Sequence, residues 1–167
     1  MRRKTQAVRR AQVDVFGAVT GNRLVLMTPD EVDAALGTPI LGIRTIDAFE
    51  QLSDARAEMR RAVAEEMAQI KSFEEFMVGV CEALTNAIKH GGAAVYQVLD
   101  RGGVLQVAIS DVGPGIDVKT LPSATLEAGF STKGSLGVGF TIMLEVSDRV
   151  LLSTRPSGTT VVLETCR

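Results

Sequence analysis

The sequence has no tryptophan, one tyrosine, one histidine and two cysteines among its 167 residues. Two cysteines, Cys81 and Cys166, cannot build a disulfide framework, so we expect a reducing, cytoplasmic setting. No apolar run approaches the roughly 20 residues of a membrane span, so no membrane partner is expected. The net charge of −2 lacks the strong positive field that general nucleic-acid binding needs, which argues against direct nucleic-acid contact.

The composition is that of one compact domain with a substantial core. Apolar residues make up 46% of the chain and charged residues 23%, an ordinary mixture for a globular protein. Alternation and turn signals predict strands over 39–46, 93–99, 104–110, 149–154 and 159–164. Periodicity predicts helices over 47–67, 72–91, 119–128 and 139–147. Together they predict an α+β fold: a two-layer α/β sandwich with a mostly antiparallel mixed sheet and helices on one face.

The N-terminal part predicts a hairpin over 11–28 that turns at Gly21 and Asn22. A short helix should follow Thr28, where a proline and a capping box with Glu31 coincide. Two further capping boxes are expected, Asp47 with Glu50 and Ser72 with Glu75.

One face of the predicted helix 72–91 carries a polar stripe. At 100° per residue, Glu82, Asn86 and Lys89 fall within about 60° of one another, and the apolar residues fall opposite. A carboxylate and a carboxamide one turn apart suit a hydrated cation or a proton transfer. A solvated helix face would have the same pattern, so the stripe alone does not decide between these interpretations.

Two glycine-rich segments follow this helix in the chain. Asp111-x-Gly113-x-Gly115 ends a predicted strand; it is either a simple turn or a place where a carboxylate reads an exocyclic amine such as that of adenine. Gly134, Gly137 and Gly139 precede or open the last predicted helix, where unpaired N–H groups can cradle phosphates. A flexible loop with an ordinary helix entry explains the second segment equally well.

The three patterns in this order resemble the N box and two glycine boxes of the Bergerat-fold (GHKL) ATPases, the superfamily of histidine kinases and gyrase. The segment Phe130-Ser-Thr-Lys133, followed by Gly137-Val-Gly-Phe140, resembles the anti-sigma-factor serine/threonine kinases. The resemblance covers roughly residues 40 to 165. It implies a histidine-kinase-like ATPase domain over 40–167, preceded by an N-terminal hairpin-helix extension over 1–39.

The resemblance implies a site for ATP and Mg²⁺. Glu82 would be the catalytic base, Asn86 would hold the metal, and Asp111 would read adenine with help from Thr159. The remaining nucleotide contacts that it implies are Lys89, Gly113, Gly115, Thr132, Lys133, Gly134, Gly137, Val138 and Gly139.

The resemblance also implies partners. Members of this family phosphorylate a small antagonist protein (an anti-anti-sigma factor of STAS type) and sequester a sigma factor, so we expect those clients and a homodimer. Two alternatives stay open: a non-catalytic ATP-binding interaction module, and a histidine-kinase-type catalytic domain acting in trans. The only histidine, His90, lies within the N box and leaves no separate phosphoacceptor in this chain.

Overall fold

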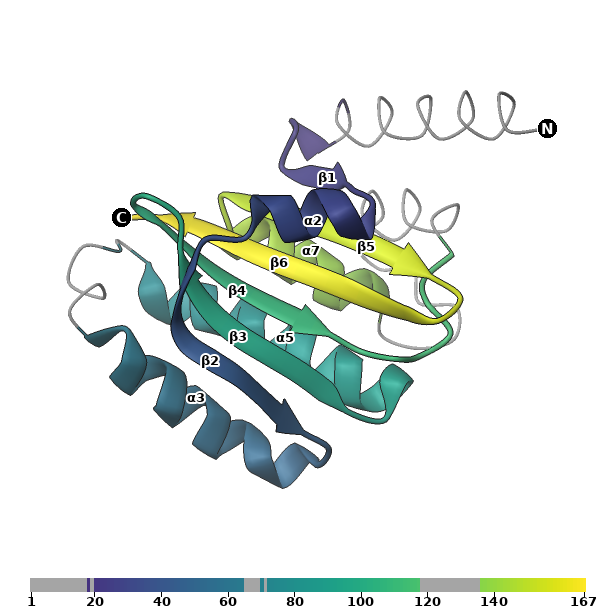
Figure 1. Ribbon diagram of the computed structural model, residues 1–167, viewed down its shortest axis with the longest axis horizontal. Helices are drawn as coiled ribbons and strands as arrows, with labels where there is room; N and C mark the ends of the chain where they lie inside the picture. Colours follow the sequence, from purple (N-terminus) through teal and green to yellow (C-terminus); the bar gives the residue numbers. More distant parts are fainter. Residues whose placement is uncertain (1–17, 19, 65–69, 71, 118–135) are drawn as a thin grey trace.

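The computed structural model describes residue 18 and residues 20–64, 70, 72–117 and 136–167. Its centre is a six-stranded sheet in the order β1-β5-β6-β4-β3-β2 (Figure 1). The strands are β1 (Leu24–Leu26), β2 (Thr38–Ile46), β3 (Ala94–Asp100), β4 (Val104–Ser110), β5 (Arg149–Arg155) and β6 (Gly158–Cys166). Strand β1 pairs in parallel with β5 and the other pairs are antiparallel, which confirms the predicted mixed, mostly antiparallel sheet.

Three helices pack on one face of the sheet: α3 (Leu52–Ala62), α5 (Phe73–Gly91) and α7 (Leu136–Val146). A short 3₁₀ turn, η1 (Phe49–Gln51), precedes α3. The predicted two-layer fold is therefore confirmed, with one addition. Helix α2 (Pro29–Ala35) packs on the opposite face, where Val32 and Ala35 join Leu151 and Val162 in a second, smaller apolar cluster (Figure 1).

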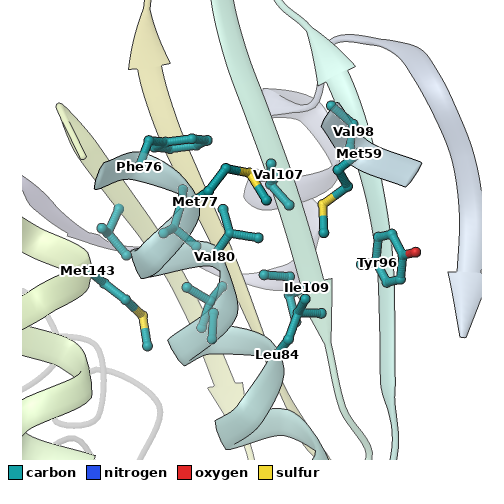
Figure 2. Packing of buried hydrophobic residues seen from close by; sticks show 14 of the residues in the cluster. Met59, Phe76, Met77, Val80, Leu84, Tyr96, Val98, Val107, Ile109 and Met143 are labelled. Carbon is teal, nitrogen blue, oxygen red and sulfur yellow. The ribbon is translucent and has the colours of Figure 1, made fainter. Parts of the chain in front are cut away.

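The main core lies between α5 and the sheet. Helix α5 turns Phe76, Met77, Val80 and Leu84 inward, and none of them is more than 1% exposed. Figure 2 shows them against side chains of β3 and β4, with Met143 of α7 beside them. Burying a large apolar side chain contributes roughly 1.5–3 kcal/mol, so this face fixes how α5 is rotated. The polar edge of α5 is thereby held in one orientation.

The capping residues predicted from the sequence agree only in part with the observed helix ends. Thr28 and Glu31 form the predicted capping box at α2, and Gly92 ends α5 in the left-handed conformation at φ 78°. The box predicted for Asp47 and Glu50 is wrong, because Gln51 instead reaches back to accept from the backbone N–H groups of Asp47 and Ala48. Ser72 precedes α5 but makes no capping hydrogen bond, since its backbone is not extended as a capping residue requires.

The hairpin predicted over 11–28 is wrong in the residues that the structure describes. Ala18 and Thr20 are helical, and Gly21 and Asn22 form a turn with φ values of 61° and 63° that leads from this helical segment into β1. Strand β1 pairs with β5, and the amide of Met27 donates to the carbonyl of Leu152 at 2.8 Å. The predicted turn is confirmed, but the strand that follows it pairs with β5 and not with the described residues that precede the turn.

A buried polar cluster attaches the end of α2 to the sheet. Gln106 is fully buried on β4; its amide donates to the carbonyl of Ala35 (3.0 Å) and to Glu164 (2.7 Å), and accepts from the N–H of Gly37 (2.8 Å). Glu164, itself buried, also accepts from Arg149 at 2.6 Å. Because each of these polar groups has a partner, they can be buried without the usual penalty. The segment that follows α2 is therefore fixed to the centre of the sheet.

A second polar cluster joins α3 to β2 and β3. The hydroxyl of Tyr96 donates to Glu58 at 3.1 Å, and Arg44 pairs with the other oxygen of Glu58 at 2.8 Å. Burial, and then the carboxylate of Glu58, raise the pKa of Tyr96 to about 12. The guanidinium of Arg44 lowers the pKa of Glu58.

We predict that Tyr96 titrates near pH 12 in the folded protein. It is the only tyrosine in the chain, so the tyrosinate absorbance reports this residue alone. The unfolded chain loses the phenolic proton near pH 10 and the folded chain keeps it to about 12, so stability falls as pH rises through this window. Tyr96→Phe should remove this contribution to the alkaline loss of stability. A native-state absorbance midpoint near pH 10 would contradict the prediction.

Candidate nucleotide site

The polar edge of α5 lines one side of a cavity of about 160 Å³. Asn86 and His90 come from this edge, Asp111 from the loop after β4, and Thr159 from β6. Asp117 adds a second carboxylate from the loop after β4, and most of the remaining wall is apolar. The apolar side chains from the sheet and from α7 are Ile109, Phe140, Met143 and Val161. An apolar slot with a few convergent polar groups is the usual form of a small-molecule site and suits a planar base.

Asp111 stands at the polar end of this slot and is held in place by the backbone. Its N–H donates to the carbonyl of Thr159 at 2.9 Å, and its Oδ1 accepts from the N–H of Gly113 at 2.8 Å. None of the described donors is bonded to Oδ2. The carboxylate is therefore fixed in position and keeps acceptor capacity for a ligand, as reading an amine requires.

The loop that begins at Asp111 lies closely on the β5–β6 hairpin. The N–H of Ile116 donates to Thr154 Oγ1 at 2.7 Å, and the hydroxyls of Thr154 and Thr159 are 3.2 Å apart. Gly115 has a φ of 78°, and a Cβ at this position would stand 2.1 Å from the carbonyl oxygen of Arg155. Only glycine fits here, which explains the second glycine of the motif.

Glu82 and Asn86 meet α7 at Gly139. A Cβ on Gly139 would be 3.0 Å from Asn86 Nδ2 and 3.2 Å from Glu82 Oε2, so the missing side chain lets both polar groups lie against α7. Asn86 Nδ2 is buried without a hydrogen-bond partner among the described residues. An unpartnered buried amide is costly, and such groups mark places where a ligand or ion completes the bonding.

The chemistry of this end of the site fits Mg²⁺. Magnesium is usually held by one or two protein oxygens together with substrate phosphates and waters, rather than by a full protein cage. The Asn86 carboxamide, with the Glu82 carboxylate one turn away, supplies such a small donor set. Rotating the Asn86 carboxamide by about 180° exchanges its oxygen and its nitrogen, so the oxygen can face the metal from the same position.

The structure brings together part of the predicted site. Asn86, Asp111, Gly115 and Thr159 line the cavity; Glu82 and Gly139 adjoin it, and Gly113 binds Asp111. Gly137 and Val138 lie with Gly139 in the first described turn of α7, which begins at Leu136 rather than at the predicted residue 139. Lys89 is exposed on the last turn of α5 and does not line the cavity. Thr132, Lys133 and Gly134 lie outside the described residues, as does the predicted helix over 119–128.

Several lining residues were missed from the sequence. Ala83, Ala87 and His90 follow one edge of α5 at helical spacing, beside the polar stripe, and Phe140 and Met143 are three residues apart on α7. The spacing of small residues next to the stripe was a usable signal for a ligand-facing edge. For Phe140 and Met143 the sequence gives no such signal, because core residues have the same spacing.

Comparison with known proteins decides the family. Residues 47–165 match the family described as histidine kinase-like ATPase domain. This chain belongs to that family. An anti-sigma F factor from Geobacillus sp. (strain WCH70) is 34% identical over 134 residues, covering 70% of this chain and 87% of the relative. Another from Lysinibacillus sphaericus is 36% identical over 125 residues, covering 68% and 85%.

Solved structures agree on the fold. The catalytic domain of histidine kinase ThkA aligns with a TM-score of 0.50 at 14% identity, covering 75% of this chain and 98% of that domain. The resemblance stated from the three motifs is thus confirmed for the histidine kinase-like ATPase family, and the relatives agree with its anti-sigma branch. Membership of this ATPase family implies that the protein binds ATP. Within the described part of the chain, no helix combines the length and apolarity needed to cross a bilayer.

We predict that Gly139→Ala weakens Mg²⁺-dependent ATP binding about tenfold, since small displacements of positioning groups are costly. The new methyl group would push Asn86 and Glu82 aside. The fold should be retained, because alanine favours a helix over glycine by roughly 1 kcal/mol and this gain offsets part of the cost of crowding. Calorimetric titration with and without Mg²⁺ measures the effect. Gly42→Ala is the control, since a Cβ there would have only Arg44 Nη1, at 3.9 Å, within 4 Å among the described residues beyond its chain neighbours. Equal Mg²⁺-dependent affinities for Gly139→Ala and wild type would contradict the prediction.

Proposed function

We propose that the protein is an ATP-binding anti-sigma regulatory factor that acts as a serine/threonine kinase on a small antagonist protein of STAS type. The observation that supports this most directly is the pairing of Glu82 and Asn86 against Gly139, with Asp111 in the adjoining cavity. The similarity to anti-sigma F factors over about 70% of the chain supports the regulatory role and a sigma factor as the second client. We place this activity in the cytoplasm.

Adenine binds in the apolar slot. Asp111 accepts a hydrogen bond from its exocyclic amine, while Thr159 supports the same end of the slot. The orientation of Asp111 is set before the ligand arrives, because its amide and Oδ1 are already bonded within the chain. Binding therefore loses little side-chain freedom at this position.

The phosphates lie toward α7. The N–H groups of Gly137, Val138 and Gly139 face them from the first turn, Lys89 and Lys133 add positive charge, and Thr132 and Gly134 help to close over them. Asn86 would hold Mg²⁺, which neutralises phosphate charge when bound. These assignments follow from the resemblance to the Bergerat-fold ATPases.

Glu82 takes the proton from the client's serine hydroxyl. The serine oxygen then bonds to the γ-phosphorus while the bond from that phosphorus to the β–γ bridging oxygen breaks, and ADP leaves. Phosphoryl transfer of this kind depends mainly on positioning and charge neutralisation, which suits a site with one candidate base. A carboxylate can serve as that base and a carboxamide cannot, so Glu82 and Asn86 have separate roles.

We predict that Glu82→Gln keeps nucleotide binding but lowers phosphoryl transfer roughly 100-fold or more, as loss of a general base does. The assay is transfer of labelled phosphate from ATP to a serine-containing antagonist. Glu75→Gln, an exposed carboxylate on the first turn of α5, is the matched control. Wild-type transfer in Glu82→Gln would remove the base assignment.

The same assay separates the two alternatives. A non-catalytic binding module would bind ATP and transfer no phosphate with any client. A histidine-kinase-type domain acting in trans would produce an acid-labile phosphohistidine on its partner, whereas phosphoserine survives acid. The kinase proposal requires the acid-stable product.

We also propose a homodimer, in which β2, the edge strand of the sheet in the described part of the chain, contributes to the contact. Strand β2 ends the sheet, and two apolar side chains near it are exposed, Ile43 at 68% and Phe49 at 51%. An open sheet edge with apolar neighbours favours pairing. On α3, Arg56 and Arg60 both pair with Glu74 of α5, so these two charges are engaged within the chain.

We predict that light scattering at micromolar concentration gives twice the mass of one chain. Ile43→Lys should shift the protein toward monomer, because a charge at the edge opposes pairing. Val78→Lys, at an exposed position of α5, should not. A wild-type chain that is monomeric with and without nucleotide would contradict the dimer.

A further inference from the structure

The last residue of α5, Gly91, is in direct contact with the carboxylate that the proposed site uses to read adenine. A Cβ on Gly91 would stand 2.4 Å from Asp111 Cβ and 2.9 Å from both Cγ and Oδ1. These separations are shorter than a side chain tolerates. The helix end and Asp111 can therefore lie this close only because position 91 has no side chain.

Asp111 cannot easily move away from an added methyl group. Its backbone N–H is bonded to Thr159 and its Oδ1 to the N–H of Gly113. On the carbonyl side, a Cβ on Gly158 would already be 2.2 Å from the oxygen of Asp111, so the β5–β6 hairpin packs closely there. A side chain at position 91 would therefore have to displace the carboxylate, break its bond to Gly113, or push α5 away.

Gly113, on the loop after β4, approaches the end of α5 as closely as Gly91 approaches Asp111. A Cβ on Gly113 would lie 2.6 Å from the carbonyl oxygen of His90 and 3.0 Å from Gly91 Cα. The last turn of α5 and the loop after β4 thus interlock through two glycines. Helix α5 carries Asn86 five residues before Gly91, a rise of about 7.5 Å along the helix. The interlock therefore sets the distance between the Asn86 end of the site and Asp111.

We propose that Gly91 is a positioning residue that determines nucleobase specificity: it allows the Asp111 carboxylate to stand where the 6-amino group of adenine binds. This inference rests on the proposed adenine site. Gly91 touches no ligand itself. Its effect is on where Asp111 lies, and hence on the discrimination between a purine with a 6-amino group and one with a 6-oxo group.

The test compares the affinities of ATP and inosine triphosphate, whose 6-oxo group offers no hydrogen to the carboxylate. In wild type, ATP should bind at least about tenfold more tightly, as expected for a hydrogen bond to a charged group. In Gly91→Ala this preference should fall to within about threefold, mainly through weaker ATP binding. A merely structural defect would lower the bound fraction for both triphosphates and leave the ratio of their dissociation constants unchanged.

The next residue supplies a matched control. Gly92 has a φ of 78°, and apart from its chain neighbours no atom of the described residues lies within 4 Å of a Cβ at that position. Gly92→Ala should therefore lower the unfolding temperature through backbone strain and leave the ATP preference at its wild-type value. In an Asp111→Asn background, Gly91→Ala should change the preference no further, because both substitutions act on the same carboxylate.

The contact has a second test that needs no nucleotide. Gly91→Ala should lower the unfolding temperature in the wild-type background but not in an Asp111→Gly background, where the clashing side chain is gone. If Gly91→Ala alone does not fold, recovery of the fold in the double variant supports the inference, and failure of the double variant as well overturns it. A wild-type ATP preference in folded Gly91→Ala overturns the role of Gly91 alone. Equal binding of both triphosphates by the wild-type chain overturns the adenine assignment of Asp111 together with it.

Discussion

The site depends on how closely α5 approaches its neighbours, and glycines set that distance. At one end of the contact between α5 and α7, a Cβ on Gly79 would be 2.6 Å from Val146 and 3.2 Å from Leu163. At the other end, Gly139 of α7 lies against Asn86 and Glu82. One glycine on each helix thus permits close antiparallel packing, and interiors at this density leave no room for an added methylene. This close packing of the two helices also holds the polar edge of α5 against α7.

The opposite face of the sheet is stabilised in a different way. Helix α2 is short and buries only Val32 and Ala35, so apolar contact alone holds it weakly. Gln106, buried at the centre of the sheet, adds hydrogen bonds to Ala35 and Gly37. Strand β1 then lies along β5, the strand that leads into the turn beneath Asp111. The N-terminal segment is therefore part of the same sheet that supports the nucleotide loop, and its removal would expose one strand edge and one apolar patch.

Sequence patterns predicted the elements whose signals are local. The β3–β4 and β5–β6 hairpins and the polar stripe of α5 follow from alternation, turn residues and helical spacing, and each was found within a residue or two. The N-terminal strand was assigned to the wrong partner, because parallel pairing with β5 joins residues more than a hundred positions apart. The motifs give the positions of the glycines, but the atoms that each glycine approaches depend on tertiary packing. The order Gly91-Gly92 does not indicate that a side chain at position 91 would clash with Asp111 while one at position 92 would point into open space.

The candidate site can change its behaviour without losing any of its chemical groups. The groups to which we assign chemical roles are few: the Glu82 carboxylate and the Asn86 carboxamide on α5, and the Asp111 carboxylate on the loop after β4. Their relative positions are set by backbone contacts at Gly91, Gly113 and Gly139, none of which has a side chain to bind a ligand. Transfer that relies on positioning is sensitive to displacements of about 1 Å. Substitutions at these glycines should therefore alter specificity and rate while every chemical group remains present, so the intact motif Glu82-x-x-x-Asn86 does not by itself ensure an active site.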